Sequence, residues 1–171
     1  MLNVLRKSAE TRRTARRFHA QIVARAREPY FFSNLHVADT VDGRFDMIAL
    51  HAGLVLDALK KQGRGDLAQH LTDALFLGFD EGLREQGAGD MGMSRRMKKI
   101  GDAFYGRLHA YAETATETAL VEAIVRNVYR GNPQYAEAAR HLARYVRTAR
   151  SRLVEGGLPE GDLDFGPLPG V

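Results

Sequence analysis

The residues that could carry chemistry in this chain are histidines and carboxylates, because the sequence contains no cysteine. That absence excludes disulfides, thiolate metal sites and cysteine nucleophiles. Six histidines are spread along the chain: His19, His36, His51, His70, His109 and His141. A di-iron helical bundle needs Glu-x-x-His pairs, which place two ligands on one helical face. Here Asp66/His70 and Glu137/His141 are spaced by four, and no His-Glu-x-x-His motif exists, so we expect no metal site.

Acid–base catalysis is suggested only by the acidic cluster of Asp80, Glu81 and Glu85. Asp80 and Arg84 stand four residues apart in an apparent helix, where they would pair on an exposed face. The sequence also lacks a GxxxxGK[ST] phosphate loop and a Gly-x-Ser-x-Gly elbow. We therefore predict a non-catalytic protein that holds no cofactor.

Four cations within five residues form the most unusual constellation in the chain. They begin an expected helix at 94–113, where positive charge opposes the helix dipole. A locally unfavourable choice points to function, and the alternative is a solvated face paired with Glu85 or Asp90. With the glycine-rich turn before it and the charges across that turn, the cluster defines a candidate partner-binding surface. Its residues are Asp80, Arg84, Gly89, Asp90, Arg95, Arg96, Lys98 and Lys99.

The first 30 residues carry eight Lys/Arg against two acids, a local balance of +6 in a chain of net charge +4. One side of the expected first helix presents the N-terminal cations, a candidate anion-binding surface made of Arg12, Arg13, Arg16 and Arg17. Such a basic arm favours RNA, a ribosome surface or lipid headgroups. The alternative is a solvated helix face that contributes only solubility.

A second basic stripe follows the last expected helix at Arg140, Arg144 and Arg147, with Arg150 and Arg152 beyond it. This stripe could bind an anionic surface. It could equally receive the acidic C-terminal tail of the chain itself. That tail carries Glu160, Asp162 and Asp164.

Helical periodicity positions these residues, and no segment predicts a strand. Thr40 or Asp42 is a suitable N-cap for the second helix, and Gly63 suits its C-terminal end. An aromatic segment at 30–32 is expected to be a loop packed on the core. Asn132 and Pro133 are expected to begin the last helix. The expected helices span residues 8–27, 40–63, 66–85, 94–113, 120–130 and 133–155.

We predict an all-α fold: a single-domain bundle of about six helices at 1–155, followed at 156–171 by a flexible Gly/Pro-rich tail that is extended or disordered. The hydrophobic fraction of 44% and charged fraction of 27% are ordinary for a globular domain. The segment 66–85 is apolar over the widest arc, which predicts a central place in the bundle. Without an apolar run of about 18 residues, no membrane-spanning helix is expected.

The middle of the chain resembles the ubiquinol–cytochrome c chaperone family over roughly residues 15 to 145. The resemblance rests on the order and spacing of several short sequence segments. Residues Arg126–Tyr129 match less well. The segments are Asp39–Asp46 (DTVDGRFD), Leu50-His51, Phe79–Glu85 (FDEGLRE), Gly89–Gly92 (GDMG), Arg95–Lys99 (RRMKK) and Ala103–Arg107 (AFYGR).

The resemblance implies an α-helical assembly factor for the cytochrome bc complex, acting on newly made cytochrome b or on a partner subunit. Mitochondrial members associate with the ribosome near its exit tunnel and work with a small partner protein. The arginine and serine content of the N-terminus is similar to that of a mitochondrial transit peptide. It runs without a break into the first helix, so we expect a bacterial, cytoplasmic member, with peripheral contact at the inner membrane left open.

Two other functions remain open at this stage. A nucleic-acid- or ribosome-binding module would use the N-terminal cations together with the basic stripe of the last helix, and its binding would fall steeply with salt. No motif for specific DNA readout is present. A lipid- or quinone-binding helical pocket is the third possibility, although no residue marks a headgroup site. The oligomeric state stays open.

Overall fold

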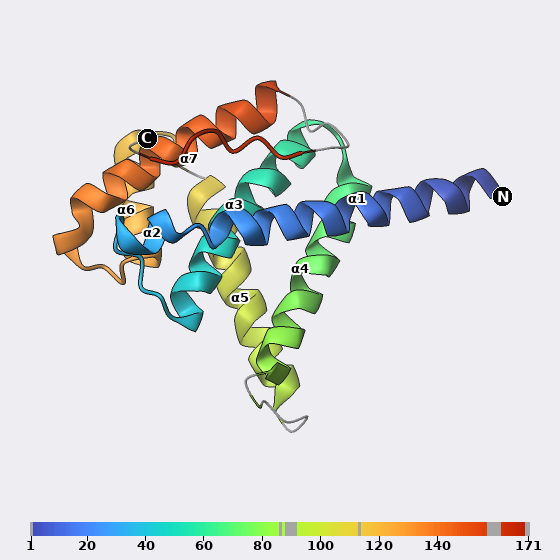
Figure 1. Cartoon of the computed structure of the whole chain (residues 1–171), viewed down its shortest axis with the longest axis horizontal. Helices are drawn as coiled ribbons and strands as arrows, with labels where there is room; N and C mark the ends of the chain where they lie inside the picture. The colour runs from blue at the N-terminus through green and yellow to red at the C-terminus, as the bar shows by residue number, and fades with distance from the viewer. Residues whose placement is uncertain (1, 86, 88–91, 113, 157–161, 170–171) are drawn as a thin grey trace.

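The computed structural model describes residues 2–85, 87, 92–112, 114–156 and 162–169, with side chains from residue 6 onward. Within these ranges the chain is all-α, with no strand, as predicted. The described elements are six long helices, one short helix and one 3-10 turn. Figure 1 shows how they are arranged. The elements are α1 (Leu2–Ala26), α2 (Pro29–Ser33), α3 (Val41–Lys61), α4 (Gly65–Glu85), α5 (Met93–Ala112), α6 (Glu117–Asn127), η1 (Pro133–Tyr135) and α7 (Ala136–Glu155).

Local signals fix the ends of α3 as expected. The Thr40 hydroxyl accepts a hydrogen bond from the Gly43 backbone N–H at 3.1 Å, which satisfies one of the donors left open at a helix start. Gly63 follows the helix with φ of +68°, a left-handed conformation that glycine adopts at little cost. Lys60 and Lys61 occupy the last turn, where positive charge complements the dipole.

Helix α3 is the centre of the bundle. Twelve of its residues are buried, and it contacts α1, α4, α5 and α7. The prediction that 66–85 would be central is wrong, because α4 buries only Leu67, Leu71 and Leu75 while Leu77 stays 59% exposed. Part of the wide apolar arc of α4 faces an open groove instead of the core.

Two further expectations need correction. The aromatic segment 30–32 is not a loop but lies in α2, because Pro29 supplies the backbone angle that a first helical position requires. Its central ring, Phe31, is fully buried, as expected of a segment packed on the core. The Asn132 side chain does cap the next segment, but Pro133 opens the 3-10 turn η1, and α7 begins only at Ala136.

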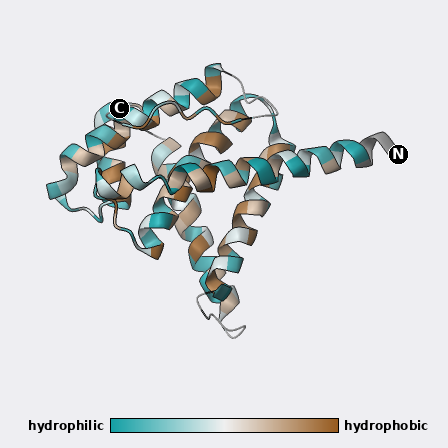
Figure 2. Ribbon diagram, in the orientation of Figure 1, coloured by the Kyte–Doolittle hydropathy of each residue, from teal (hydrophilic) through white to brown (hydrophobic). Residues whose placement is uncertain are grey.

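The molecule has two projections from its helical body (Figure 1). The N-terminal half of α1 extends to one side, and α4 and α5 converge on a second arm near the turn that joins them. Hydrophilic residues predominate on the free half of α1, whereas hydrophobic stretches continue along the α4/α5 arm (Figure 2). The arm therefore offers apolar surface away from the main core.

The described part of the tail is extended, as predicted, and it packs on the body. Leu163 and Phe165 are buried, and the Leu163 backbone N–H donates to the Gln21 side chain at 2.7 Å. The Gly166 carbonyl accepts from Arg25 on α1 at 2.6 Å. The tail thus closes one face of the bundle between α1 and α7.

Candidate functional site: an apolar groove edged by cations

A groove of about 930 Å³ lies between the start of α3, the end of α4 and the middle of α5. Its walls are mostly apolar, and its charged residues comprise five cations and two acids. The apolar and glycine residues are Val41, Phe45, Ile48, Gly78, Phe79, Gly82, Leu83, Ile100 and Ala103. The charged residues are Arg27, Asp42, Arg44, Glu85, Lys99, Arg107 and Arg130.

Aromatic rings in mutual contact lie at the groove between α3, α4 and α5. The rings of Phe45 on α3 and Phe79 on α4 lie 5.2 Å apart, and Phe79 contacts the fully buried Phe104 of α5 at 5.9 Å. These tilted and edge-to-face contacts are favourable geometries for aromatic pairs. Because Phe45 and Phe79 are only partly buried, their outer faces remain available to a ligand.

Two glycines one turn apart on α4 line the groove and have different roles. Gly78 sits so close to α1 that an added Cβ would lie 3.0 Å from the His19 ring. At Gly82 an added Cβ would meet no atom of the described residues within 4 Å. Gly82 is therefore dispensable for packing, and its lack of a side chain leaves space in the groove.

A buried ion cluster closes one end of the groove. Asp46 is fully buried on α3, and Arg107 of α5 donates to its Oδ1 from Nε at 2.7 Å and from Nη2 at 2.6 Å. Arg130, after α6, contacts Asp46 Oδ2 at 2.7 Å. The Arg107 guanidinium also lies 5.1 Å above the Phe45 ring, a cation–π contact.

Burial raises the pKa of the Asp46 carboxyl, and the two guanidiniums oppose that rise. One carboxylate shared by two arginines leaves an excess positive charge at this end of the groove. Lys99 adds an exposed cation on the opposite rim.

The structure separates the predicted partner-binding residues into three groups. Lys99 lines the groove. Asp80 and Arg84 form the expected i,i+4 ion pair at 2.9 Å on α4. Arg95, Arg96 and Lys98 are exposed on α5 outside the groove lining, and Lys98 pairs with Asp102 at 3.4 Å and not with Glu85. Gly89 and Asp90 lie outside the described residues.

The N-terminal cations are all exposed on α1, on either side of the buried Ala15. They take no part in the groove lining. Their use as an anion-binding surface stays a prediction.

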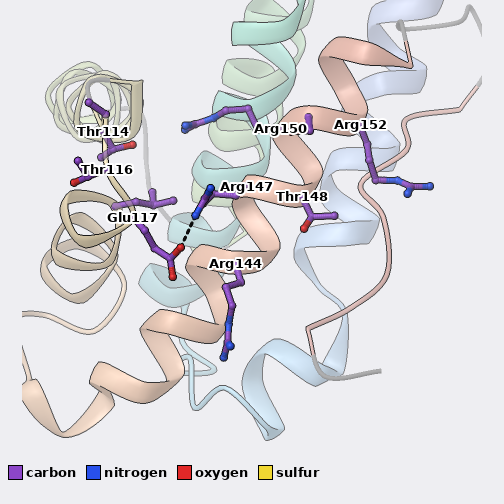
Figure 3. Close-up of a pocket in the computed structure, with 11 residues that line it drawn as sticks. Thr114, Thr116, Glu117, Arg144, Arg147, Thr148, Arg150 and Arg152 are labelled. Carbon is purple, nitrogen blue, oxygen red and sulfur yellow. Dashed lines mark hydrogen bonds and ion pairs between the residues drawn. The ribbon is translucent and has the colours of Figure 1, made fainter.

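A second cleft of about 780 Å³, the polar cleft, lies between the α5–α6 connection and α7 (Figure 3). Its arginines already have internal partners: Arg147 pairs with Glu117, Arg150 donates to the Tyr111 carbonyl at 3.0 Å, and Arg152 pairs with Asp164 of the tail at 2.7 Å. The tail therefore neutralises Arg152, at the end of the basic stripe. This contact agrees with the alternative in which the stripe receives the acidic tail of the chain itself. These internal contacts make the polar cleft a weaker candidate than the groove.

Sequence reasoning missed Asp46, Arg107 and Arg130 as site residues. The sequence does contain a signal for Asp46, because it is an acid placed between the apolar residues Phe45 and Met47 in α3. Asp46 and Arg107 both stand within segments that carry the family resemblance. Only the folded structure brings the three together, since Arg107 and Asp46 are 61 residues apart.

In the part of the chain that the structure describes, no helix is both long enough and apolar enough to cross a membrane. No group of three or more potential metal ligands was found over the same residues.

The protein is therefore all-helical, with an apolar recess that is edged by charge and has open space at Gly82. The chain belongs to the ubiquinol–cytochrome c chaperone family, whose model matches residues 33–156. Membership identifies it as an assembly chaperone of the bc complex. The matched range contains α3, α4, α5 and Arg130, and thus nearly all of the groove, but excludes the N-terminal cations.

A solved structure supports the same assignment. The chain is similar to the Cbp3 homolog from Brucella abortus, with 34% sequence identity and a TM-score of 0.84 over 100% of this chain and 99% of that one. Among curated proteins, none matches the chain. The family and the all-α fold predicted from the sequence are both confirmed.

Proposed function

We propose that this assembly chaperone holds newly made cytochrome b, and that the groove between α3, α4 and α5 is where it does so. The observation that carries the proposal is the groove itself, an open apolar recess on a chain of this family. Membrane-protein segments expose large apolar surface before assembly, and an exposed apolar patch rimmed by polar residues is typical of a protein-binding surface. Val41, 58% exposed at the rim, extends the apolar surface outward.

The charged edge suits the same task. Cations around an apolar recess keep the chaperone in solution when the groove is empty. They also steer a partner of opposite charge without adding much affinity. The candidate partner-binding residue that fits this description best is Lys99, and Asp80, Arg84, Arg95, Arg96 and Lys98 extend the proposed contact along the arm.

The test fills the groove without disturbing the fold. Gly82→Trp places a large side chain in the groove, where a Cβ has open space. Gly106→Trp is the matched control, because it changes an exposed helical glycine of α5 that also has open space but does not line the groove. Both variants should fold, since replacing glycine within a helix is favourable for the backbone.

We expect Gly82→Trp to reduce the cytochrome b that copurifies with the tagged chain by about tenfold, because it fills the centre of the contact surface. Haem b absorbance of the membranes should fall with it, while Gly106→Trp retains wild-type capture. Equal capture by the two folded variants would remove the groove as the holding site.

A second candidate function is favoured by the N-terminal cations, which are exposed on α1 and lie outside the matched range. They would bind RNA, most directly on a ribosome. Replacing all four by glutamine preserves the helix and removes the charge, which truncation would not do because Ala15 is buried among them. Ribosome cosedimentation that falls with salt in the wild-type chain and is lost in this variant would support the function. Cosedimentation unchanged by the substitutions would contradict it.

A further inference from the structure

The buried ion cluster at the closed end of the groove has two guanidiniums and one carboxylate, and therefore an excess of positive charge. Asp46 supplies one carboxylate, fully buried, and two guanidiniums share it. Arg44, on the rim, is already paired with Asp39 at 2.7 Å. The excess charge therefore centres on the two arginines around Asp46.

The two arginines differ in how fully they are used. Arg107 makes two contacts to Asp46, donates from Nη1 to the Ala103 carbonyl at 3.0 Å, and lies over the Phe45 ring. Its side chain is only 18% exposed. Arg107 therefore serves as the internal partner of Asp46.

Arg130 is placed to serve a ligand. Its side chain is 50% exposed, and its contacts to Asp46 and to the Asn127 carbonyl both come from Nη1. A guanidinium has five N–H donors in a planar fork, so Nε and Nη2 remain available within the part of the chain described. That fork matches a carboxylate with two parallel hydrogen bonds.

The backbone at Arg130 supports a functional reading. Arg130 adopts φ of +56°, in the left-handed region, and the following Gly131 has φ of +76°. A non-glycine residue in this region costs about 1 kcal/mol or more. Such outliers gather at binding sites, where the position of the side chain compensates for the strain.

We infer that the groove selects an apolar helical segment that carries one acidic side chain, and that Arg130 binds this carboxylate. The inference rests on the proposed function and names the chemistry of the segment held. Charge complementarity favours this ligand. An apolar segment without an acid would bury the excess positive charge of the two arginines and leave it unpaired. A carboxylate on an apolar segment is equally costly to leave unpaired. The groove would thus shelter such a segment until it reaches its own partners.

The geometry limits how much of the segment is held. The groove wall on α4 runs from Gly78 to Glu85, about two helical turns or roughly 10 Å. The cation Arg130 lies at the end next to Asp46, and the rings of Phe45 and Phe79 lie between α3 and α4. The segment would place its acid beside Arg130 and an apolar face on the rings.

A pair of labelled peptides tests the inference with the full chain. Each is a helical peptide of about 20 residues with a leucine face and lysines outside that face; one carries a single Glu within the leucine face, and its twin carries Gln. Fluorescence anisotropy measures both affinities for the wild-type chain. We expect the Glu peptide to bind about tenfold more tightly, with a preference that shrinks as salt is raised.

Substitutions then assign the preference to Arg130. Arg130→Gln should abolish the preference, so that the two peptides bind with equal affinity. Arg130→Lys, which keeps the charge but not the fork, should retain part of it. Arg126→Gln is the matched control, because Arg126 is exposed on α6 outside the groove lining, and it should keep the full preference.

The possible results separate the inference from the proposed function. Equal binding of both peptides to the wild-type chain, blocked by Gly82→Trp, would overturn the inference and leave the groove as the holding site. Equal weakening of both peptides by Arg130→Gln would also overturn it, because that pattern reflects a structural role. Failure of both peptides to bind the wild-type chain, together with cytochrome b capture that survives Gly82→Trp, would overturn both.

Discussion

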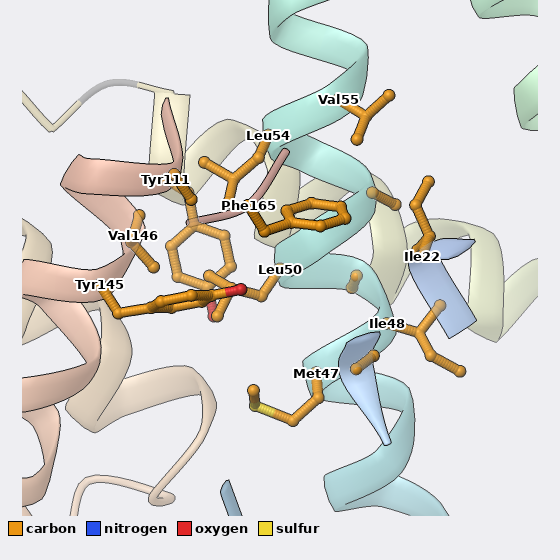
Figure 4. Packing of buried hydrophobic residues seen from close by; sticks show 14 of the residues in the cluster. Ile22, Met47, Ile48, Leu50, Leu54, Val55, Tyr111, Tyr145, Val146 and Phe165 are labelled. Carbon is orange, nitrogen blue, oxygen red and sulfur yellow. The ribbon is translucent and has the colours of Figure 1, made fainter. Parts of the chain in front are cut away.

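Helix α3 has two sides that are packed to different degrees. One side, facing α1, α7 and the tail, forms a buried layer around His51, with Phe31, Tyr145 and Phe165 in contact with its ring. Figure 4 shows Tyr145 and Phe165 of this layer beside α3. The other side, at Phe45, opens on the groove. The buried layer has the features of a structural core, whereas the groove has those of a binding surface.

Polar groups show the same contrast. In the buried layer, Arg25 donates to the Tyr145 hydroxyl at 2.9 Å, and that hydroxyl donates to His51 Nε2 at 2.8 Å. His51 Nδ1 in turn donates to the Met47 carbonyl at 2.7 Å. This network satisfies a neutral histidine fully, while the groove leaves an excess of positive charge around Asp46. Stability should therefore depend on the first region, and recognition on the second.

Phe31→Ala should produce the largest effect on stability. The ring is fully buried against His51 and Tyr145, so its removal should cost about 4 kcal/mol in the free energy of unfolding. Urea denaturation measures this loss, and the folded fraction should still bind the Gln peptide normally. Phe79→Ala is the matched change in the groove, where the half-buried ring should cost only about 1–2 kcal/mol but weaken peptide binding. Equal losses of stability for the two variants would contradict the assignment of stability to the buried layer and of recognition to the groove.

The fold was largely predictable because its signals are local. Thr40 and Gly63 mark the ends of α3, and the hydroxyl cap and the left-handed glycine are both present in the structure. Periodicity places residues on a helix face, but it does not tell whether that face meets a core or a groove. Phe79 and Leu83 illustrate the error, since both belong to the apolar arc of α4 and both line the groove.

The site was harder to predict because it depends on contacts between distant segments. The cation cluster of α5 can be recognised in the sequence because its residues are consecutive or nearly so. Of its members, only Lys99 lines the groove. Arg130 gave no such signal, because nothing near it in the sequence indicates that it meets Asp46. Its left-handed backbone and its ion pair both arise only on folding.

The pH dependence of stability should report on the buried layer. Burial lowers the pKa of His51 to about 4 from 6.5, with Arg25 acting in the same direction. The unfolded chain therefore binds more protons between these values, and stability falls as pH drops from 6.5 to 4, by about 3 kcal/mol in total. Burial also lowers the pKa of His19, which adds to the trend, and raises that of Asp46, which opposes it at the acid end.

Urea denaturation at several pH values compares the wild-type chain with His51→Gln. The variant should be less stable at pH 7 but should show a clearly shallower slope between pH 6.5 and 4. Parallel slopes for the two proteins would mean that the buried layer does not set the pH dependence.

Charge reversal on α5 should give the smallest effect and sharpens the boundary of the binding surface. Lys99→Glu reverses the exposed cation that lines the groove away from Arg130, and it should weaken binding of the Glu peptide by no more than about threefold, since exposed charges contribute little. Reversal of Arg95, Arg96 and Lys98 together changes three exposed cations outside the lining. At physiological ionic strength, salt largely screens the interaction between exposed charges that are more than about 8 Å apart. The combined effect of the three substitutions on peptide affinity should therefore be no larger than that of Lys99→Glu alone. Both variants should unfold within about 0.5 kcal/mol of wild type, since these are exposed positions. A larger effect from the triple reversal would move the binding surface from the groove onto the outer face of the arm, where the run of cations first suggested it.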